Sequence, residues 1–142
     1  MLFAEEKLLQ KNFDVVYMIS GEKKLAVIAN KNLHLKTISL YDLKMIFLKQ
    51  KRVLNGVSLV PINLEALNPT RKIFEKEVLH LSRNRLKEYW TKKHYMGVRP
   101  PIHLKSAQSV LSFVTKVDGA IAYIPSNELY KIEDVKNAIN DK

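Results

Sequence analysis

The feature that most constrains the fold is an uninterrupted apolar run at residues 25–29, Leu-Ala-Val-Ile-Ala, bounded by Lys24 and Asn30. A strand with one solvated face alternates apolar and polar residues, whereas a strand inside an α/β sheet is apolar throughout because both of its faces are covered. We therefore expect a strand that is buried on both faces. No apolar run in the chain approaches the roughly 20 residues needed to span a bilayer.

Segments typical of strands and helices alternate along the rest of the chain. Short, β-branched or apolar segments bounded by turn residues predict further strands at residues 15–19, 57–62 and 120–124. Four polar residues precede apolar residues at helical spacing and predict helix N-caps: Ser39, Asn68, Ser82 and Ser106. This alternation predicts an α/β fold with a mostly parallel sheet flanked by helices.

The length of 142 residues fits one domain, because two cores of half this size would each be marginal. We assign residues 12–130 to that domain and residues 131–142 to a polar C-terminal tail. Residues 1–11 are either a flexible N-terminus or the remnant of a secretory signal, since an apolar stretch ending in Ala4 precedes a polar Glu pair.

Composition excludes several classes of chemistry. The chain has no cysteine, which rules out thiol catalysis, disulfides, iron–sulfur clusters and Cys-ligated zinc. The four histidines lack the spacing of a metal site, and no enzyme motif is found, so we expect a non-enzymatic protein without a cofactor. A net charge of +10 and a pI near 9.7 instead favour an anionic partner.

Two helix starts offer donors suited to an oxyanion. A parallel sheet places ligands beyond the carboxyl ends of its strands, and the free N–H groups of helix N-termini bind anions there. The candidate ligand-binding residues lie at these starts, in the loop between them and at an earlier cap: Thr70, Arg71, Asn68, Ser106, Arg99 and Ser39. Helix capping and one surface arginine would explain the same residues, and the sequence leaves both interpretations open.

Several segments also carry, in order, the pattern of a known family. They are residues 25–32, residues 38–49, Val60-Pro-Ile-Asn63, Arg71-x-x-Phe74, Tyr89-Trp90, Arg99-Pro-Pro101, Ser106 and Gly119-Ala-Ile-Ala-Tyr-Ile124. Together they resemble the phosphate ABC-transporter substrate-binding proteins (PstS-like, periplasmic binding protein type II), and the resemblance covers about residues 25–125. The Phe-x-Gly of the family motif is replaced here by Phe47-Leu48-Lys49.

The resemblance implies a single lobe of the type II architecture, which captures phosphate or another oxyanion without catalysis. It also implies a periplasmic location and an ABC-transporter permease or another membrane protein as a partner. Thr70 and Arg71 match the loop that opens a ligand-binding helix in the family, whose Ser-Gly is replaced here by Asn68-Pro69.

Two other functions stay open. A protein-interaction module that kept the fold but lost the ligand would use a surface around Tyr89, Tyr95 and the loop at Arg99. A basic polyanion-binding domain would use the positive charges of residues 49–52 and 83–93, with Tyr89, Trp90 and Tyr95 as stacking rings. No nucleic-acid motif accompanies these charges, and nucleic acid is not the expected partner. The sequence does not indicate the oligomeric state.

Overall fold

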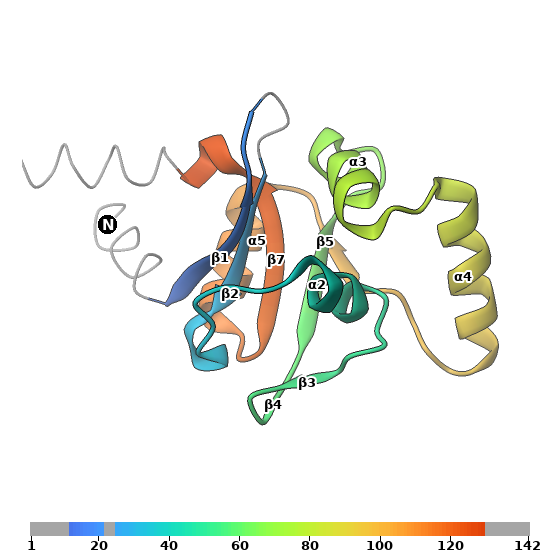
Figure 1. The fold of residues 1–142 in the computed structure, drawn as a ribbon, viewed down its shortest axis with the longest axis horizontal. Helices are drawn as coiled ribbons and strands as arrows, with labels where there is room; N and C mark the ends of the chain where they lie inside the picture. The colour runs from blue at the N-terminus through green and yellow to red at the C-terminus, as the bar shows by residue number, and fades with distance from the viewer. Residues whose placement is uncertain (1–11, 22–24, 130–142) are drawn as a thin grey trace, which may run out of the picture.

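A computed structural model describes residues 12–21 and 25–129 (Figure 1). Its centre is a five-stranded sheet with the strand order β1-β2-β7-β5-β6. The strands are β1 (Phe13–Ile19), β2 (Leu25–Asn30), β7 (Ala120–Pro125), β5 (Val60–Leu64) and β6 (Ile102–Leu104). The predictions for residues 1–11 and 131–142 lie outside the described residues.

The sheet is mixed, so the expectation of a mostly parallel sheet is wrong. β2 pairs antiparallel with both β1 and β7, whereas β5 pairs parallel with both β7 and β6. For β1 and β2 the physical reason is the short connection at residues 20–24: a parallel pair needs a crossover of about a dozen residues or more, and five residues suffice only for a hairpin. The α/β class itself is confirmed.

Helices cover both faces of the sheet (Figure 1). α2 (Leu40–Phe47) and α3 (Pro69–Phe74), which continues into the π-helical segment η2 (Glu75–Leu79), lie on one face, and α5 (Ala107–Lys116) lies on the other. α4 (Arg83–Tyr95) stands at the periphery, on the side of the molecule away from β1. Within the described residues, none of the helices is long and apolar enough to cross a bilayer.

The strand expected at residues 57–62 is split in two. β4 (Val57–Ser58) pairs with β3 (Val53–Leu54) in a small separate hairpin, and β5 begins only at Val60. The turn of this hairpin is Asn55-Gly56, in which both residues have positive φ. A turn with left-handed residues matches the twist of a short antiparallel pair, which explains why the segment folds back before it joins the main sheet.

All four predicted N-caps are confirmed. Each side-chain oxygen accepts a backbone N–H of the first helical turn, at distances of 2.9–3.2 Å: Ser39 from Asp42, Asn68 from Thr70, Ser82 from Arg85 and Ser106 from Ser109. Pro69 occupies the first helical position, where its missing N–H is not needed. Local capping therefore fixes where the helices begin.

Among the positions with left-handed backbone geometry, Lys49 and Gly119 adopt it for different reasons. Lys49 has φ 58° directly after α2, at the place where the family motif has glycine. Gly119 has φ 78° before β7, and its N–H donates to Asn32 Oδ1 at 3.0 Å. A Cβ at Gly119 would overlap the carbonyl oxygen of Ser58, so glycine is required there by space as well as by φ.

The core lies between the sheet and its helices. All six residues of β2 are buried, which confirms the interpretation of the apolar run. On the face covered by α2 and α3, Phe74 stacks on Tyr123 with ring centroids 4.0 Å apart, and Phe47 meets Phe74 edge-on at 4.6 Å. α4 contributes one buried side chain, Leu86, to this core, and its partly buried Tyr89 and Trp90 pack against the core.

Candidate functional site

A cavity of about 310 Å³ lies where β5 ends, between the α3–η2 segment and α4. Its polar and aromatic lining comes from these elements and from the end of α2: Phe47, Asn63, Arg71, Glu75, Arg83, Asn84, Lys87 and Trp90. The site thus sits at the carboxyl end of a strand in the parallel half of the sheet, which is the edge where α/β proteins place their ligands.

The side chain of Asn63 is held in one orientation by a hydrogen-bond relay. The Leu64 N–H donates to Tyr123 Oη at 3.3 Å, and the Tyr123 hydroxyl donates to Asn63 Oδ1 at 2.7 Å. The Tyr123 hydroxyl is the donor in its contact with Asn63, so the oxygen of the carboxamide faces Tyr123. The Nδ2 group is left as the donor that Asn63 offers to the cavity.

Because Tyr123 is buried, the hydrogen-bond relay keeps the same donors and acceptors over the ordinary pH range. Tyr123 is fully buried, and its burial raises the pKa of the phenol well above the ordinary value of 10. The hydroxyl therefore keeps its proton and stays a donor. Asn63 is itself only 9% exposed, and its Nδ2 has no hydrogen-bond partner among the described residues. A buried polar group without a partner costs about 1–3 kcal/mol, which a ligand can recover.

A buried carboxylate positions two arginines around the cavity. Glu75 Oε2 accepts from Arg71 Nε at 3.0 Å and from Arg83 Nη2 at 3.4 Å. Arg71 Nη1 also donates to the Leu64 carbonyl at 2.9 Å, and Arg83 Nη2 donates to the Ala66 carbonyl at 2.8 Å. A guanidinium has five N–H donors, so each arginine keeps N–H groups that these bonds do not use.

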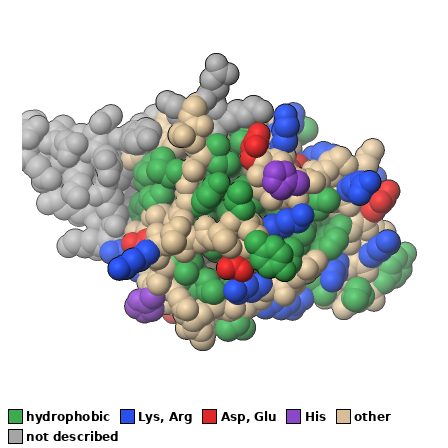
Figure 2. Space-filling view, in the orientation of Figure 1, with side chains coloured by type: hydrophobic (Ala, Val, Ile, Leu, Met, Phe, Trp, Pro, Cys, Tyr) green, Lys and Arg blue, Asp and Glu red, His purple; other side chains and the backbone are tan. Residues whose placement is uncertain are grey.

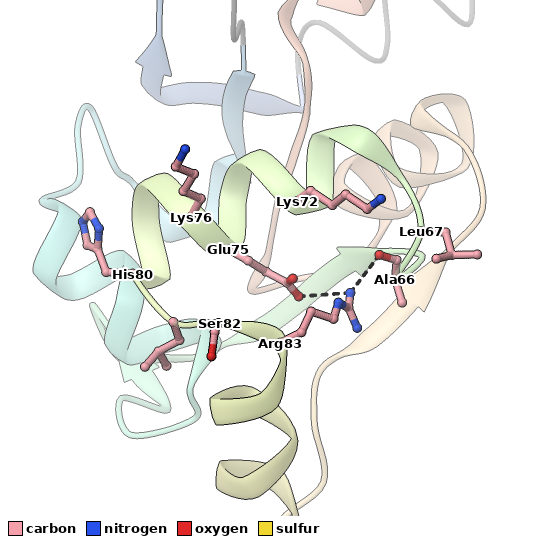
Figure 3. Close-up of a pocket in the computed structure, with 9 residues that line it drawn as sticks. Ala66, Leu67, Lys72, Glu75, Lys76, His80, Ser82 and Arg83 are labelled. Atoms are coloured by element: carbon pink, nitrogen blue, oxygen red, sulfur yellow. Dashed lines mark hydrogen bonds and ion pairs between the residues drawn. The ribbon is translucent and has the colours of Figure 1, made fainter.

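Figure 3 shows how Arg83 reaches from α4 to Glu75 and to the loop at Ala66. A second, wider pocket of about 700 Å³ lies around this bridge. Lys72 and Lys76 also line it, but their side chains point away from Glu75 and do not converge with Arg83 (Figure 3). The smaller cavity is therefore the better-formed site for a charged ligand.

The smaller cavity has a positive balance. Arg71, Arg83 and Lys87 bring three positive charges, and Glu75 brings one negative charge, which leaves +2. On the face seen in Figure 2, Lys and Arg side chains lie between hydrophobic ones over the half that carries α2, α3 and α4. The charge of the cavity wall favours an anion, and the Asn63 amide supplies a directional donor.

Of the predicted site residues, the structure brings only Arg71 into this cavity. Thr70 is 7% exposed, and its backbone N–H already donates to Asn68 Oδ1 at 2.9 Å. The start of α3 is thus capped by the protein itself. Helix capping, the alternative that the sequence left open, accounts for Asn68.

The other three predicted residues do not converge on the cavity. Ser106 caps α5 on the opposite face of the sheet, and its Oγ lies 3.0 Å from Ser109 Oγ. Ser39 is exposed at the start of α2, and Arg99 is exposed in the loop before β6. The predicted set therefore splits between separate parts of the molecule.

The sequence reasoning missed Asn63, Glu75, Arg83 and Lys87. Two signals were present: Asn63 is a polar residue at the end of an apolar strand, and Glu75 stands four residues after Arg71, the spacing of a helical ion pair. The sequence marks Arg83 and Lys87 only as members of the basic run at residues 83–93, because their place at the cavity depends on where α4 packs.

Within residues 12–21 and 25–129, no group of three or more His, Cys, Asp or Glu side chains is arranged to hold a metal ion. No protein-family model matches the sequence, and a search of curated proteins finds no significant match. The cavity is therefore the feature of the molecule from which a function can be inferred.

Proposed function

We propose that this protein is a non-enzymatic binding module for a small oxyanion, phosphate among the candidates, and that its site is the cavity between α3–η2 and α4. The observation that carries the proposal is the buried Asn63 amide, which faces a positively charged cavity with its Nδ2 donor unused by the described residues. A donor fixed in this way recognises an acceptor such as a phosphate, sulfate or carboxylate oxygen.

The roles of the charged residues follow from their contacts. Glu75 orients the guanidinium of Arg71, which offers its remaining N–H groups to the ligand. Lys87 adds a flexible positive charge from α4, and no side-chain contact within the described residues ties it elsewhere. We therefore expect the anion to lie beside Arg71 and next to α4. The sequence instead suggested a position at the start of α3.

The resemblance to phosphate ABC-transporter substrate-binding proteins supports a wider setting for this activity. In that setting the protein acts in the periplasm and passes its ligand to an ABC-transporter permease or another membrane protein. Both parts belong to the proposal, and they depend on anion binding being found first.

Calorimetric titration with inorganic phosphate and with sulfate at low salt tests the proposal. We expect binding that falls about five- to tenfold in Lys87→Gln, the loss of one charged contact. Lys92→Gln is the matched control, because Lys92 lies on the same helix and does not line the cavity. Equal binding by both variants, or no binding of phosphate, sulfate, phenyl phosphate or benzoate, would refute the proposal.

Asn63→Asp gives a second, independent arm. The aspartate keeps an oxygen for the Tyr123 hydroxyl but replaces the cavity-facing donor with a negative oxygen. We expect anion binding to be lost while circular dichroism shows the fold retained. Association driven by total charge would instead fall equally in Lys87→Gln and Lys92→Gln and weaken steeply with salt.

One observation favours the interaction module as a second candidate. Tyr95 and Met96 at the end of α4 are 85% and 69% exposed. Tyr89 does not belong to this surface, because it is half-buried and its hydroxyl donates to the Leu48 carbonyl at 2.7 Å. A photo-crosslinking residue at Tyr95, compared with one at the exposed Tyr41, tests this candidate: a partner crosslinked only from Tyr95 would support it.

A further inference from the structure

We infer that the ligand of this cavity is an organic anion, with an anionic head and a compact apolar or aromatic body, rather than a bare inorganic ion. The inference rests on the proposed function, since it assumes that the cavity binds an anion. It adds the chemical class of the ligand. We infer this class from the volume of the cavity and from the apolar residues that line one side of it.

The cavity is too large for an inorganic oxyanion alone. Its volume of about 310 Å³ lies at the lower end of the range for small organic ligands, about 300–1,000 Å³. One water molecule takes about 30 Å³ of liquid, so a tetrahedral ion of five heavy atoms would leave about half of the space to water.

The lining is divided between polar and apolar residues. Asn63, Arg71 and Lys87 supply the donors and charge, whereas Leu79, Leu86 and Trp90 supply carbon surface to the same cavity. An inorganic ion would engage the polar residues and leave that carbon surface against water. An apolar group attached to the anion would cover it, which is favourable in proportion to the area removed from water.

Trp90 forms part of the cavity wall and is held in place by the ring of Tyr89. It is half-buried, and its ring meets the ring of Tyr89 edge-on at 4.9 Å and 86°. Tyr89 is anchored in turn by its hydroxyl, which donates to the Leu48 carbonyl at the end of α2. A positioned indole face beside positive charge suits a flat or branched apolar body linked to an anion.

The test compares ligands that share one part and differ in the other. The full chain is titrated with inorganic phosphate, phenyl phosphate, benzoate and benzyl alcohol, and binding is followed by calorimetry and by the fluorescence of Trp90, the one tryptophan of the chain. We expect phenyl phosphate to bind at least about tenfold more tightly than inorganic phosphate. Benzyl alcohol, which lacks the charge, should bind weakly.

Benzoate separates the two possible head groups. Tighter binding of benzoate than of phenyl phosphate would identify a carboxylate as the head, and the reverse order would identify a phosphate ester. Either order supports the inference provided that both exceed inorganic phosphate. A shift of the Trp90 emission on binding should accompany the organic anions and not inorganic phosphate.

A variant pair checks that the added affinity comes from the cavity wall. Trp90→Leu should lose most of the advantage of phenyl phosphate while keeping the affinity for inorganic phosphate. Tyr95→Leu should behave as the unchanged chain, because Tyr95 is exposed and does not line the cavity. Circular dichroism confirms that both variants are folded before they are compared.

The failures of the two proposals are distinguishable. If inorganic phosphate binds through Lys87 and phenyl phosphate binds no more tightly, the inference about the organic body is wrong and anion binding stands. If phenyl phosphate binds equally well to Asn63→Asp, it binds outside the cavity and the inference is overturned. If no anion binds, both are refuted.

Discussion

Replacing Tyr123 with phenylalanine removes one oxygen from the centre of the molecule and tests the relay that orients Asn63. The ring would still stack on Phe74, so packing is almost unchanged. Two hydrogen bonds are lost, one from the Leu64 N–H and one to Asn63 Oδ1. Both groups stay buried, because Leu64 is 1% and Asn63 9% exposed.

The expected cost follows from these two orphaned groups. A buried donor or acceptor left without a partner costs about 1–3 kcal/mol, and partial relaxation of Asn63 recovers some of it, so we expect a loss of about 2 kcal/mol in the free energy of unfolding. For a domain of this size that loss lowers Tm by roughly 7 °C. The freed carboxamide can also rotate, so phosphate binding should weaken together with stability.

Urea denaturation with Tyr123→Phe and Tyr41→Phe side by side measures the effect. Tyr41 is 70% exposed, and its hydroxyl has no hydrogen bond within the described residues, so its variant should be as stable as the unchanged chain. If Tyr123→Phe also costs less than about 0.5 kcal/mol, which is the usual range of surface changes, the relay does not contribute as argued.

The raised pKa of Tyr123 gives the same residue a pH signature. The folded state resists loss of the phenolic proton, whereas the unfolded chain releases it near the ordinary pKa of 10. The stabilisation is therefore complete below about pH 10 and falls by about 1.4 kcal/mol per pH unit above it. Denaturation at about pH 9 to 11 should show a steeper loss in the unchanged chain than in Tyr123→Phe; parallel curves would contradict it.

Two backbone predictions concern left-handed positions. Gly119→Ala should destabilise the fold by more than about 2 kcal/mol, because the new Cβ meets the Ser58 carbonyl, whereas Gly56→Ala, with nearly the same φ but open space, should cost only about 1 kcal/mol; equal melting temperatures would refute the steric argument. Lys49→Gly should stabilise by up to about 1 kcal/mol, because glycine adopts φ 58° without strain. Lys51→Gly, outside the left-handed region, should not stabilise, and a similar gain in both variants would exclude the φ explanation.

The elements of the fold could be predicted where local sequence determines them. The apolar run at residues 25–29 and the caps at Ser82 and Ser106 specify strands and helix starts through burial and side-chain hydrogen bonds alone. The antiparallel pairing of β1 and β2 is also local, because the five-residue connection at residues 20–24 is long enough only for a hairpin. The antiparallel pairing of β2 with β7 is not local, because these strands are far apart in the sequence.

Of the residues that line the cavity, the sequence predicts only Arg71 as a binding residue. Arg71 was found because a helix start after a strand is a recognisable pattern. Asn63 acquires its role from Tyr123, which is 60 residues further along the chain and comes near it because β5 pairs with β7. Arg83 meets Glu75 because α4 packs beside η2. Such contacts depend on tertiary packing, which residue spacing does not encode.

Because α4 lies at the periphery, the specificity of the cavity and the stability of the fold depend on largely different residues. The sheet and the other helices contain nearly all of the buried core, whereas α4 contributes Leu86 and the partly buried Tyr89 and Trp90. Exposed α4 residues that line the cavity, such as Lys87, could therefore change which ligands bind with little effect on the melting temperature. Selection could change the specificity of such a protein quickly, because these exposed residues contribute little to the core.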